Sequence, residues 1–257
     1  MNQMILRAEG LYKSYGSIPV LKDVTISMRA GETHAVIGPN GAGKTTLFKT
    51  LSGEVFPDSG WIEIDGKRVE KLAGHRRVRI GVGRTFQVAR VFSDYSVLQN
   101  LVVAIEARAR FRKRLPTVSF RLVPLNSVVD EARGLLEQMG LGNQQDRLAG
   151  ILAYGDRKRL ELAMSLVLNP RILMLDEPMA GMSVADRSAA AETIRRVARE
   201  RGIAVLLTEH DMGVVFSLAN RITVLNYGEI IASGTPDQVR TSAKVRDIYL
   251  GHEVEHA

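Results

Sequence analysis

Residues 38–45 read Gly38-Pro39-Asn40-Gly41-Ala42-Gly43-Lys44-Thr45, and this stretch decides the fold. The apolar run His34–Ile37 precedes it, and the helical pattern Lys44–Ser52 follows it. The spacing matches G-x-x-x-x-G-K-[ST], in which glycines let consecutive backbone N–H groups turn inward around phosphate oxygens. The N-terminus of the following helix adds partial positive charge. The predicted phosphate-binding residues are Gly38, Pro39, Asn40, Gly41, Ala42, Gly43, Lys44, Thr45 and Thr46.

Two side chains of this loop have chemical roles of their own. We expect the Lys44 ammonium to reach the β- and γ-phosphates of a nucleotide, and the Thr45 hydroxyl to ligate Mg²⁺. A glycine-rich turn without function would leave the lysine unexplained. The sequence therefore predicts a nucleotide-binding protein.

A second motif comes much later in the chain, where the apolar run Ile172–Leu175 ends in Asp176 and Glu177. A buried strand delivers such residues to the carboxyl edge of a sheet, beside the phosphate loop. There Asp176 can hold Mg²⁺, and Glu177 can polarise an attacking water as general base. A strand that ends in two acids is common and often gives only a solvent-facing loop. The phosphate loop makes the catalytic interpretation the stronger one.

The composition sets wide limits on the class of protein. The 257 residues, 45% hydrophobic and 25% charged, exclude a disordered or fibrous chain and suit one large domain or one domain with an inserted lobe. The absence of cysteine excludes disulfides and thiolate chemistry. We find no apolar run of membrane-spanning length and no secretion signal, so we expect a cytosolic location.

The net charge of +7 suggests an anionic partner, such as a nucleotide, a nucleic acid or a membrane surface, although charge of this size also serves solubility. Part of it lies in one basic run. Its interpretation as a solvated face is favoured over contact with lipid headgroups or an acidic partner. The run consists of Arg108, Arg110, Arg112, Lys113, Arg114 and, further on, Arg121.

Short β-branched runs alternate with longer helical patterns, which predicts an α/β sheet with crossover helices. The first strands are separated by tight turns and look antiparallel, so a mixed architecture is expected. Strands are predicted at Ile5–Ala8, Val24–Met28, His34–Ile37, Trp61–Ile64, Ile172–Leu175, Ala204–Thr208, Ile222–Leu225 and Glu229–Ala232. Helices are predicted at Lys44–Ser52, Val97–Arg108, Ser127–Met139, Asp156–Leu168 and Ala185–Arg201.

The middle of the chain has few strand signals and several helices. We interpret residues 91–168 as a helical lobe inserted into a nucleotide-binding core made by residues 1–90 and 169–233. Residues 234–257 are predicted to form a C-terminal helical tail.

With these motifs in place, nearly the whole chain resembles the ATP-binding-cassette (ABC) ATPases, a P-loop NTPase family. Gln87 matches the glutamine between core and lobe, which implies contact with Mg²⁺ or the attacking water. His210 matches the switch histidine, which implies a hydrogen bond to the γ-phosphate, and Tyr15 matches the aromatic that stacks on adenine. Each of the three alone is a weak signal, and their order with the two strong motifs carries the resemblance.

The family signature LSGGQ departs from its usual form here and reads Leu152-Ala153-Tyr154-Gly155-Asp156. Ala153 removes the hydroxyl that contacts the γ-phosphate of an opposing protomer, and Tyr154 replaces a glycine. Gly155 remains at the start of a helix, so backbone N–H groups can still face phosphate. The segment Ala180-Gly181-Met182-Ser183 also differs from the SALD typical of the family.

These departures resemble one subgroup, the ATP-binding subunits of branched-chain amino acid importers. The resemblance rests on LAYG, on EPMAGMS, on TEHDM, on the tail that begins Gly234-Thr235-Pro236, and on an insertion over residues 107–128 similar to the longer of two paired ATPases. It implies ATP hydrolysis that powers uptake of branched-chain amino acids, although similar relatives serve urea, amides or aromatic acids.

The resemblance also implies an assembly. Two ATP-binding subunits, identical or not, would close head to tail on two ATP molecules, each between Lys44 of one chain and the Gly155 loop of the other. They would bind membrane permeases at the cytoplasmic face of the plasma membrane and serve a solute-binding protein indirectly. An apolar surface of Val88, Val91, Phe92 and Tyr95 would receive a permease helix, unless these side chains lie in the core of the lobe.

Two other interpretations compete with transport. A nucleic-acid- or translation-linked ABC ATPase would suit the net charge, but the chain has no second cassette, coiled-coil insertion or lysine-rich tail. A P-loop small-molecule kinase would need neither the LAYG segment nor a switch histidine. We therefore expect no nucleic-acid partner.

Overall fold

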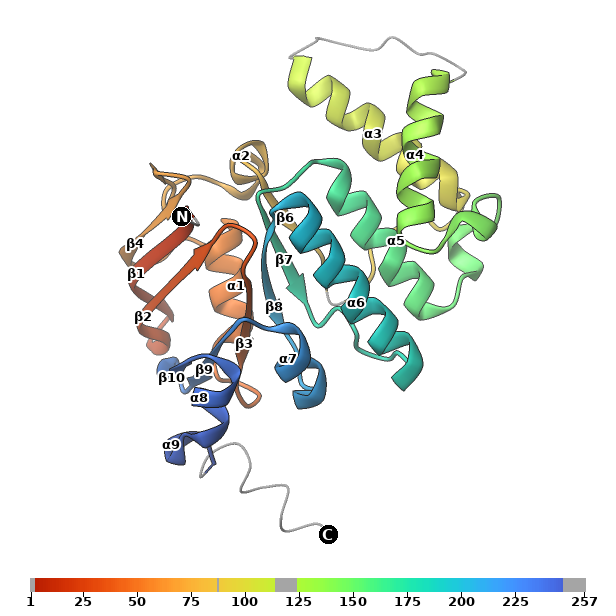
Figure 1. The fold of residues 1–257 in the computed structure, drawn as a ribbon. Coiled ribbons are helices and arrows are strands. Elements are labelled where there is room, and N and C mark those ends of the chain that lie inside the picture. The colour runs from red at the N-terminus through yellow and green to blue at the C-terminus, as the bar shows by residue number, and fades with distance from the viewer. Residues whose placement is uncertain (1–2, 87, 114–123, 247–257) are drawn as a thin grey trace.

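A computed structural model describes residues 3–86, 88–113 and 124–246. Several sequence-based expectations fall on residues outside these ranges, namely Gln87, Arg114, Arg121 and the end of the tail from residue 247. Within the described part, two sheets lie side by side and a helical lobe flanks one of them (Figure 1).

The first sheet is antiparallel and has the order β2-β1-β4-β5. The expected antiparallel pairing of the early strands is thus confirmed. Its strands are β1 (Met4–Tyr15), β2 (Ile18–Arg29), β4 (Ser59–Ile64) and β5 (Lys67–Arg68).

The central sheet has the order β10-β9-β3-β8-β7-β6, and only the β9–β10 pair is antiparallel. All five residues of β3 and all five of β8 are buried, because helices or the other sheet cover both faces of a parallel sheet. Its strands are β3 (Thr33–Ile37), β6 (Val82–Arg84), β7 (Ile172–Asp176), β8 (Ala204–Thr208), β9 (Arg221–Asn226) and β10 (Glu229–Gly234).

Helix α1 (Lys44–Ser52) lies between the two sheets. Its buried Leu47, Phe48 and Leu51 share one core with apolar residues of both sheets. The opposite face of the central sheet is covered by α6 (Val184–Arg201) and α7 (Met212–Leu218). The phosphate loop therefore joins a buried strand to a buried helix, and its position is fixed on both sides.

The helical lobe follows β6 and ends before β7, on the side of the central sheet away from the antiparallel sheet (Figure 1). It contains α3 (Val97–Lys113), α4 (Asn126–Gln138) and α5 (Tyr154–Val167), with 3₁₀ turns at Gly142–Gln144 and Ala149–Ile151. The remaining helices are α2 (Gly74–Arg79), α8 (Pro236–Thr241) and α9 (Ala243–Val245).

The eight predicted strands and five predicted helices are confirmed, with β1 and β2 longer than expected and α3 extended to Lys113. The sequence interpretation missed β5, β6, α2 and α7, which are short. Among the described residues no helix is both long and apolar enough to cross a membrane.

A fully buried histidine on β3 makes stability dependent on pH. His34 is 0% exposed, and its Nε2 lies 2.8 Å from the Thr223 hydroxyl oxygen. Burial, with a smaller contribution from Arg221, lowers the pKa of His34 from 6.5 to about 4. Between these values the unfolded chain binds a proton that the folded chain does not, so stability is lost as the pH falls through this window.

Lowering the pH from 7 to 5 is therefore expected to reduce the unfolding free energy of the wild type by about 2 kcal/mol more than that of His34→Gln, whose side chain does not titrate. Urea denaturation at the two pH values measures the difference. His75→Gln, a change at an exposed histidine, is the control and should keep the wild-type pH dependence. An equal pH dependence of wild type and His34→Gln would contradict the prediction.

Candidate nucleotide site

Two glycines give the loop between β3 and α1 its path. Gly38 has φ +153° and Gly43 has φ +104°, which side chains rarely adopt. A Cβ at Gly38 would overlap the Leu225 carbonyl oxygen, and one at Gly43 would lie 2.8 Å from the Val20 carbonyl oxygen. Gly41, in contrast, faces open space. The loop backbone thus packs closely on β2 and β9 and leaves its other side open.

Lys44 is only 8% exposed and lies inside its own loop. Its Nζ donates hydrogen bonds to the carbonyl oxygens of Gly38, at 2.6 Å, and Pro39, at 3.0 Å. Burial lowers the pKa of Lys44, whereas the carboxylates of Glu177 and Asp176 raise it. The structure thus brings the lysine and both predicted acids into one electrostatic environment.

Asp176 stands at the carboxyl end of β7, as its buried strand predicts. Its Oδ1 accepts a hydrogen bond from the Thr208 hydroxyl at 2.9 Å, and its Oδ2 lies 3.4 Å from Nη2 of Arg84. Arg84 also pairs with Glu54, just after α1. Sequence reasoning missed Arg84, because nothing in the pattern around β6 marks a partner that lies 92 positions away.

Glu177 has φ +46°, a left-handed conformation that is costly for a residue with a side chain. Two hydrogen bonds from its N–H, to the carbonyl oxygen of Thr208 at 3.2 Å and to its hydroxyl at 3.1 Å, hold it there. Its Oε1 lies 2.9 Å from Nε2 of His210, whose side chain is 48% exposed. The structure therefore places the predicted base and the predicted switch histidine in direct contact.

The neighbours of His210 tie its segment to the loop that follows Glu177. Oε1 of the buried Glu209 accepts a hydrogen bond from the Met179 N–H at 2.8 Å, and burial raises the pKa of Glu209. Arg187 donates to Asp211 at 2.6 Å and to the Met182 carbonyl oxygen at 3.0 Å. The hydrogen bond from the Val214 N–H, together with Arg187, lowers the pKa of Asp211.

Tyr15 is 47% exposed at the end of β1. It pairs with Ile18 across the tight turn to β2. Strand β2 also carries Val20, whose carbonyl oxygen lies against Gly43 of the phosphate loop. An exposed aromatic ring thus stands on a hairpin that contacts the loop.

The altered signature segment lies at the start of α5, where Ala153 is the N-cap and Gly155 belongs to the first turn. A Cβ on Gly181 would be 3.4 Å from the Tyr154 ring, and a Cβ on Gly155 would be 3.6 Å from Met182 Cγ. The two unusual motifs of the sequence thus pack on each other within one chain. Gly155 lies beside the loop that follows Glu177, outside the phosphate loop.

Gly181 has φ +71°, so Gly181→Ala is expected to lower the unfolding free energy by about 1–2 kcal/mol, because it adds left-handed strain beside the Tyr154 ring. Gly134→Ala is the matched control. Gly134 lies within α4, and a Cβ added there would have no neighbour within 4 Å. Its replacement by alanine should therefore be stabilising by up to about 1 kcal/mol. Thermal or urea unfolding measures both, and equal effects would contradict the prediction.

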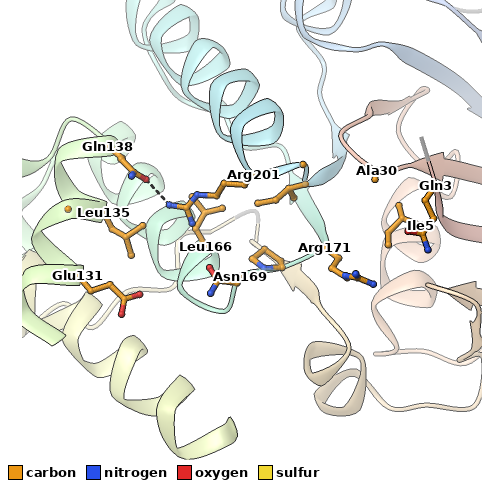
Figure 2. Close-up of a pocket in the computed structure, with 14 residues that line it drawn as sticks. Gln3, Ile5, Ala30, Glu131, Leu135, Gln138, Leu166, Asn169, Arg171 and Arg201 are labelled. Carbon is orange, nitrogen blue, oxygen red and sulfur yellow. Dashed lines mark hydrogen bonds between the residues drawn. The ribbon is translucent and has the colours of Figure 1, made fainter. Parts of the chain in front are cut away.

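A cavity of about 670 Å³ lies away from the phosphate loop, near the amino ends of the central strands (Figure 2). It is lined by α4, the start of β1 and the segment before β8. Two of its lining residues are joined by a hydrogen bond, which Arg201 Nη2 donates to Gln138 Oε1 at 2.7 Å. The cavity shares no lining residue with the predicted phosphate-binding set.

The fold and this arrangement of loop and acids define a class, the ATP-binding cassettes. The family model described as "ABC transporter" matches residues 21–180, so the chain belongs to the ABC transporter family. It is the ATPase subunit of a transporter complex. The cassette MJ1267 of an ABC transporter, solved in its ADP conformation, has a TM-score of 0.84 and 29% identity and covers 97% of this chain and 99% of its own.

The other matches point to particular proteins within this family. A second model, "Branched-chain amino acid ATP-binding cassette transporter", matches residues 229–255. The high-affinity branched-chain amino acid transport ATP-binding protein LivG of Salmonella typhimurium is 39% identical over 98% of this chain and 99% of its own length. BraF of Pseudomonas aeruginosa is 38% identical over 98% and 99%. The lipopolysaccharide export system ATP-binding protein LptB of Haemophilus influenzae is 36% identical over 97% and 98%. These matches confirm the predicted family and give no support to a nucleic-acid-linked ATPase.

Proposed function

We propose that this chain hydrolyses ATP to power the import of branched-chain amino acids. Overall identity alone does not settle the cargo, because LivG and LptB differ by only three percentage points, 39% against 36%. The observation that carries the proposal is the match of residues 229–255 to the branched-chain model, together with the LAYG and AGMS segments.

The residues around the loop suit a triphosphate. We assign the phosphates to the backbone N–H groups of residues 38–46, except Pro39, which has none, with Lys44 turning from the Gly38 and Pro39 carbonyl oxygens toward the β- and γ-phosphates. Tyr15 would stack on the adenine for about 1–3 kcal/mol. Adenine would thus lie against the β1–β2 hairpin and the phosphates against α1.

The donor set also fits Mg²⁺, which prefers oxygen ligands and keeps several waters. The Thr45 hydroxyl and the Asp176 carboxylate would hold it, with Gln87 as the third predicted ligand. Once bound, Mg²⁺ neutralises phosphate charge. Glu177 would take the proton of the attacking water, and His210 would orient that carboxylate through the contact of 2.9 Å and also reach the γ-phosphate.

The proposed division of the chain follows from these roles. Residues 1–90 and 169–233 form the nucleotide core, residues 91–168 form the lobe with Gly155, and residues 234–257 form the tail.

Gly155 would complete the ATP site of a second subunit, because it lies outside the phosphate loop of its own chain. The subunit would sit on the cytoplasmic face of the membrane, beneath permeases that a solute-binding protein supplies.

An exposed apolar surface at the start of the lobe suits a permease contact. Val88 is 73% exposed, Phe92 49% and Tyr95 45%, and the rings of Phe92 and Tyr95 are 5.5 Å apart. Val91 is partly buried and packs on the core of the lobe, so it contributes less. The three exposed side chains could dock a short helix.

Uptake in a strain deleted for this gene tests the proposed function. The strain should lose uptake of radiolabelled leucine, isoleucine and valine, the wild-type gene should restore it, and Lys44→Ala should not. Normal leucine uptake in the deletion strain, with loss of another solute, would contradict the cargo. Unchanged uptake of every solute tested would contradict the transport role.

A further inference from the structure

Two buried charges on α5 hold the chain that leads from the central sheet into the lobe. Lys158 and Glu161 have side chains only 3% and 5% exposed and lie one helical turn apart, with Nζ and Oε2 separated by 3.8 Å. Burying charges is costly unless partners compensate it. Here part of the compensation comes from backbone groups outside the helix.

Those groups belong to the chain segment on both sides of residue 87. Lys158 Nζ donates to the Phe86 carbonyl oxygen at 2.6 Å. Glu161 Oε1 accepts from the N–H groups of Phe86 and Arg90, each at 3.2 Å. Three hydrogen bonds to these two side chains thus connect Phe86 and Arg90 to α5.

The attachment begins at a defined point. The N–H of Thr85 donates to the Met174 carbonyl oxygen of β7 at 2.9 Å, which continues the pairing of the central sheet. The next peptide group, that of Phe86, is held by α5 instead. The boundary between chain attached to the sheet and chain attached to the lobe therefore lies between Thr85 and Phe86.

We propose that Lys158 and Glu161 are positioning residues that fasten Phe86 and Arg90 to α5, so that these two residues move with the lobe. The start of the same helix carries Gly155. Movement of the signature segment toward a second subunit would then move Phe86 and Arg90 with it. This role in ATP turnover rests on the proposed function, whereas the attachment itself does not.

The test compares the purified full-length wild type with Lys158→Met/Glu161→Leu, which replaces the pair by apolar side chains and avoids an unpaired buried charge. Amide hydrogen exchange of the segment around residues 85–90 should accelerate at least about tenfold, because the buried acceptor of two N–H groups is gone. For ATP hydrolysis, kcat should fall at least about tenfold and KM should stay within about twofold, since the phosphate loop is intact.

Two further variants separate positioning from a merely structural role. Glu161→Gln keeps a side-chain oxygen for the two N–H groups and should retain kcat within about threefold of wild type. Glu192→Leu/Arg195→Met removes an exposed pair with the same spacing on α6 and should leave exchange and kinetics unchanged. If the first double variant does not fold, Glu161→Leu carries the same two measurements, because it also removes the acceptor of the two N–H groups.

Unchanged exchange and kcat in the double variant would overturn the proposal. So would an equal loss of kcat in Glu161→Gln and in the double variant, because only the latter lacks the acceptor. The exchange measurement needs no ATP. If the wild type hydrolyses no ATP, the proposed function is contradicted. The hydrogen-exchange measurement still decides whether Lys158 and Glu161 attach Phe86 and Arg90 to α5.

Discussion

Glu177→Gln is expected to lower kcat for ATP hydrolysis by about 10³-fold while ATP still binds. The amide keeps the size of the carboxylate and can still accept a hydrogen bond from His210, so the contact of 2.9 Å survives. What is lost is the base that takes a proton from water. Steady-state hydrolysis and equilibrium ATP binding, measured on the same preparation, separate the two effects.

The variant should also accumulate as a dimer on ATP, because closure depends on binding and reopening depends on hydrolysis. Size-exclusion chromatography with and without ATP detects this. Glu192→Gln, at an exposed glutamate on α6, is the control and should hydrolyse ATP at the wild-type rate. Hydrolysis by Glu177→Gln at that rate would show that Glu177 is not the base.

The strained backbone of Glu177 explains why the site depends on its surroundings. A left-handed φ at a residue with a side chain persists only where neighbours over-determine it. Thr208 supplies two acceptors for the Glu177 N–H and also donates to Asp176. One threonine at the end of β8 thus orients both acids of the candidate site.

Local sequence patterns were enough to predict the centre of the fold. The runs that became β3 and β7 are short and apolar and end in the two motifs, and a buried parallel strand needs no distant information to be recognised. The glycines of the loop were equally readable, because their spacing is local. Gln87 lies outside the described residues, so its role stays a prediction.

Long-range contacts could not be predicted in this way. Arg77 is fully buried and donates to the carbonyl oxygens of Thr50 and Leu51 at the end of α1, 27 and 26 positions away. It satisfies helix carbonyl groups that have no partner within α1. In the sequence Arg77 is one arginine among several in Arg76-Arg77-Val78-Arg79, and only the fold selects it.

The altered signature segment is a second case in which the sequence could not predict a long-range contact. The sequence revealed two departures from the family pattern, LAYG and AGMS, as separate facts. The structure relates them, because Tyr154 packs against Gly181 and Met182 against Gly155. A larger signature residue and a glycine in the facing loop are therefore physically compatible partners.

Lys44→Ala is expected to weaken ATP binding by about 30- to 150-fold, the loss of roughly 2–3 kcal/mol that a hydrogen bond between charged groups supplies. The buried ammonium lies among loop carbonyl oxygens and close to two carboxylates, so its removal also changes the charge that a triphosphate would meet. Isothermal titration calorimetry with ATP measures the affinity.

Lys49→Ala, in the last turn of the same helix α1, removes an equal charge away from the loop and serves as the control. It should leave the affinity within about threefold of wild type, because it lies at the opposite end of α1 from the phosphate loop. Similar losses in both variants would mean that net charge attracts the nucleotide, and an unchanged affinity in Lys44→Ala would refute the assignment of the phosphates to this loop. A specific loss in Lys44→Ala follows only if the triphosphate lies where the Lys44 ammonium now contacts Gly38 and Pro39.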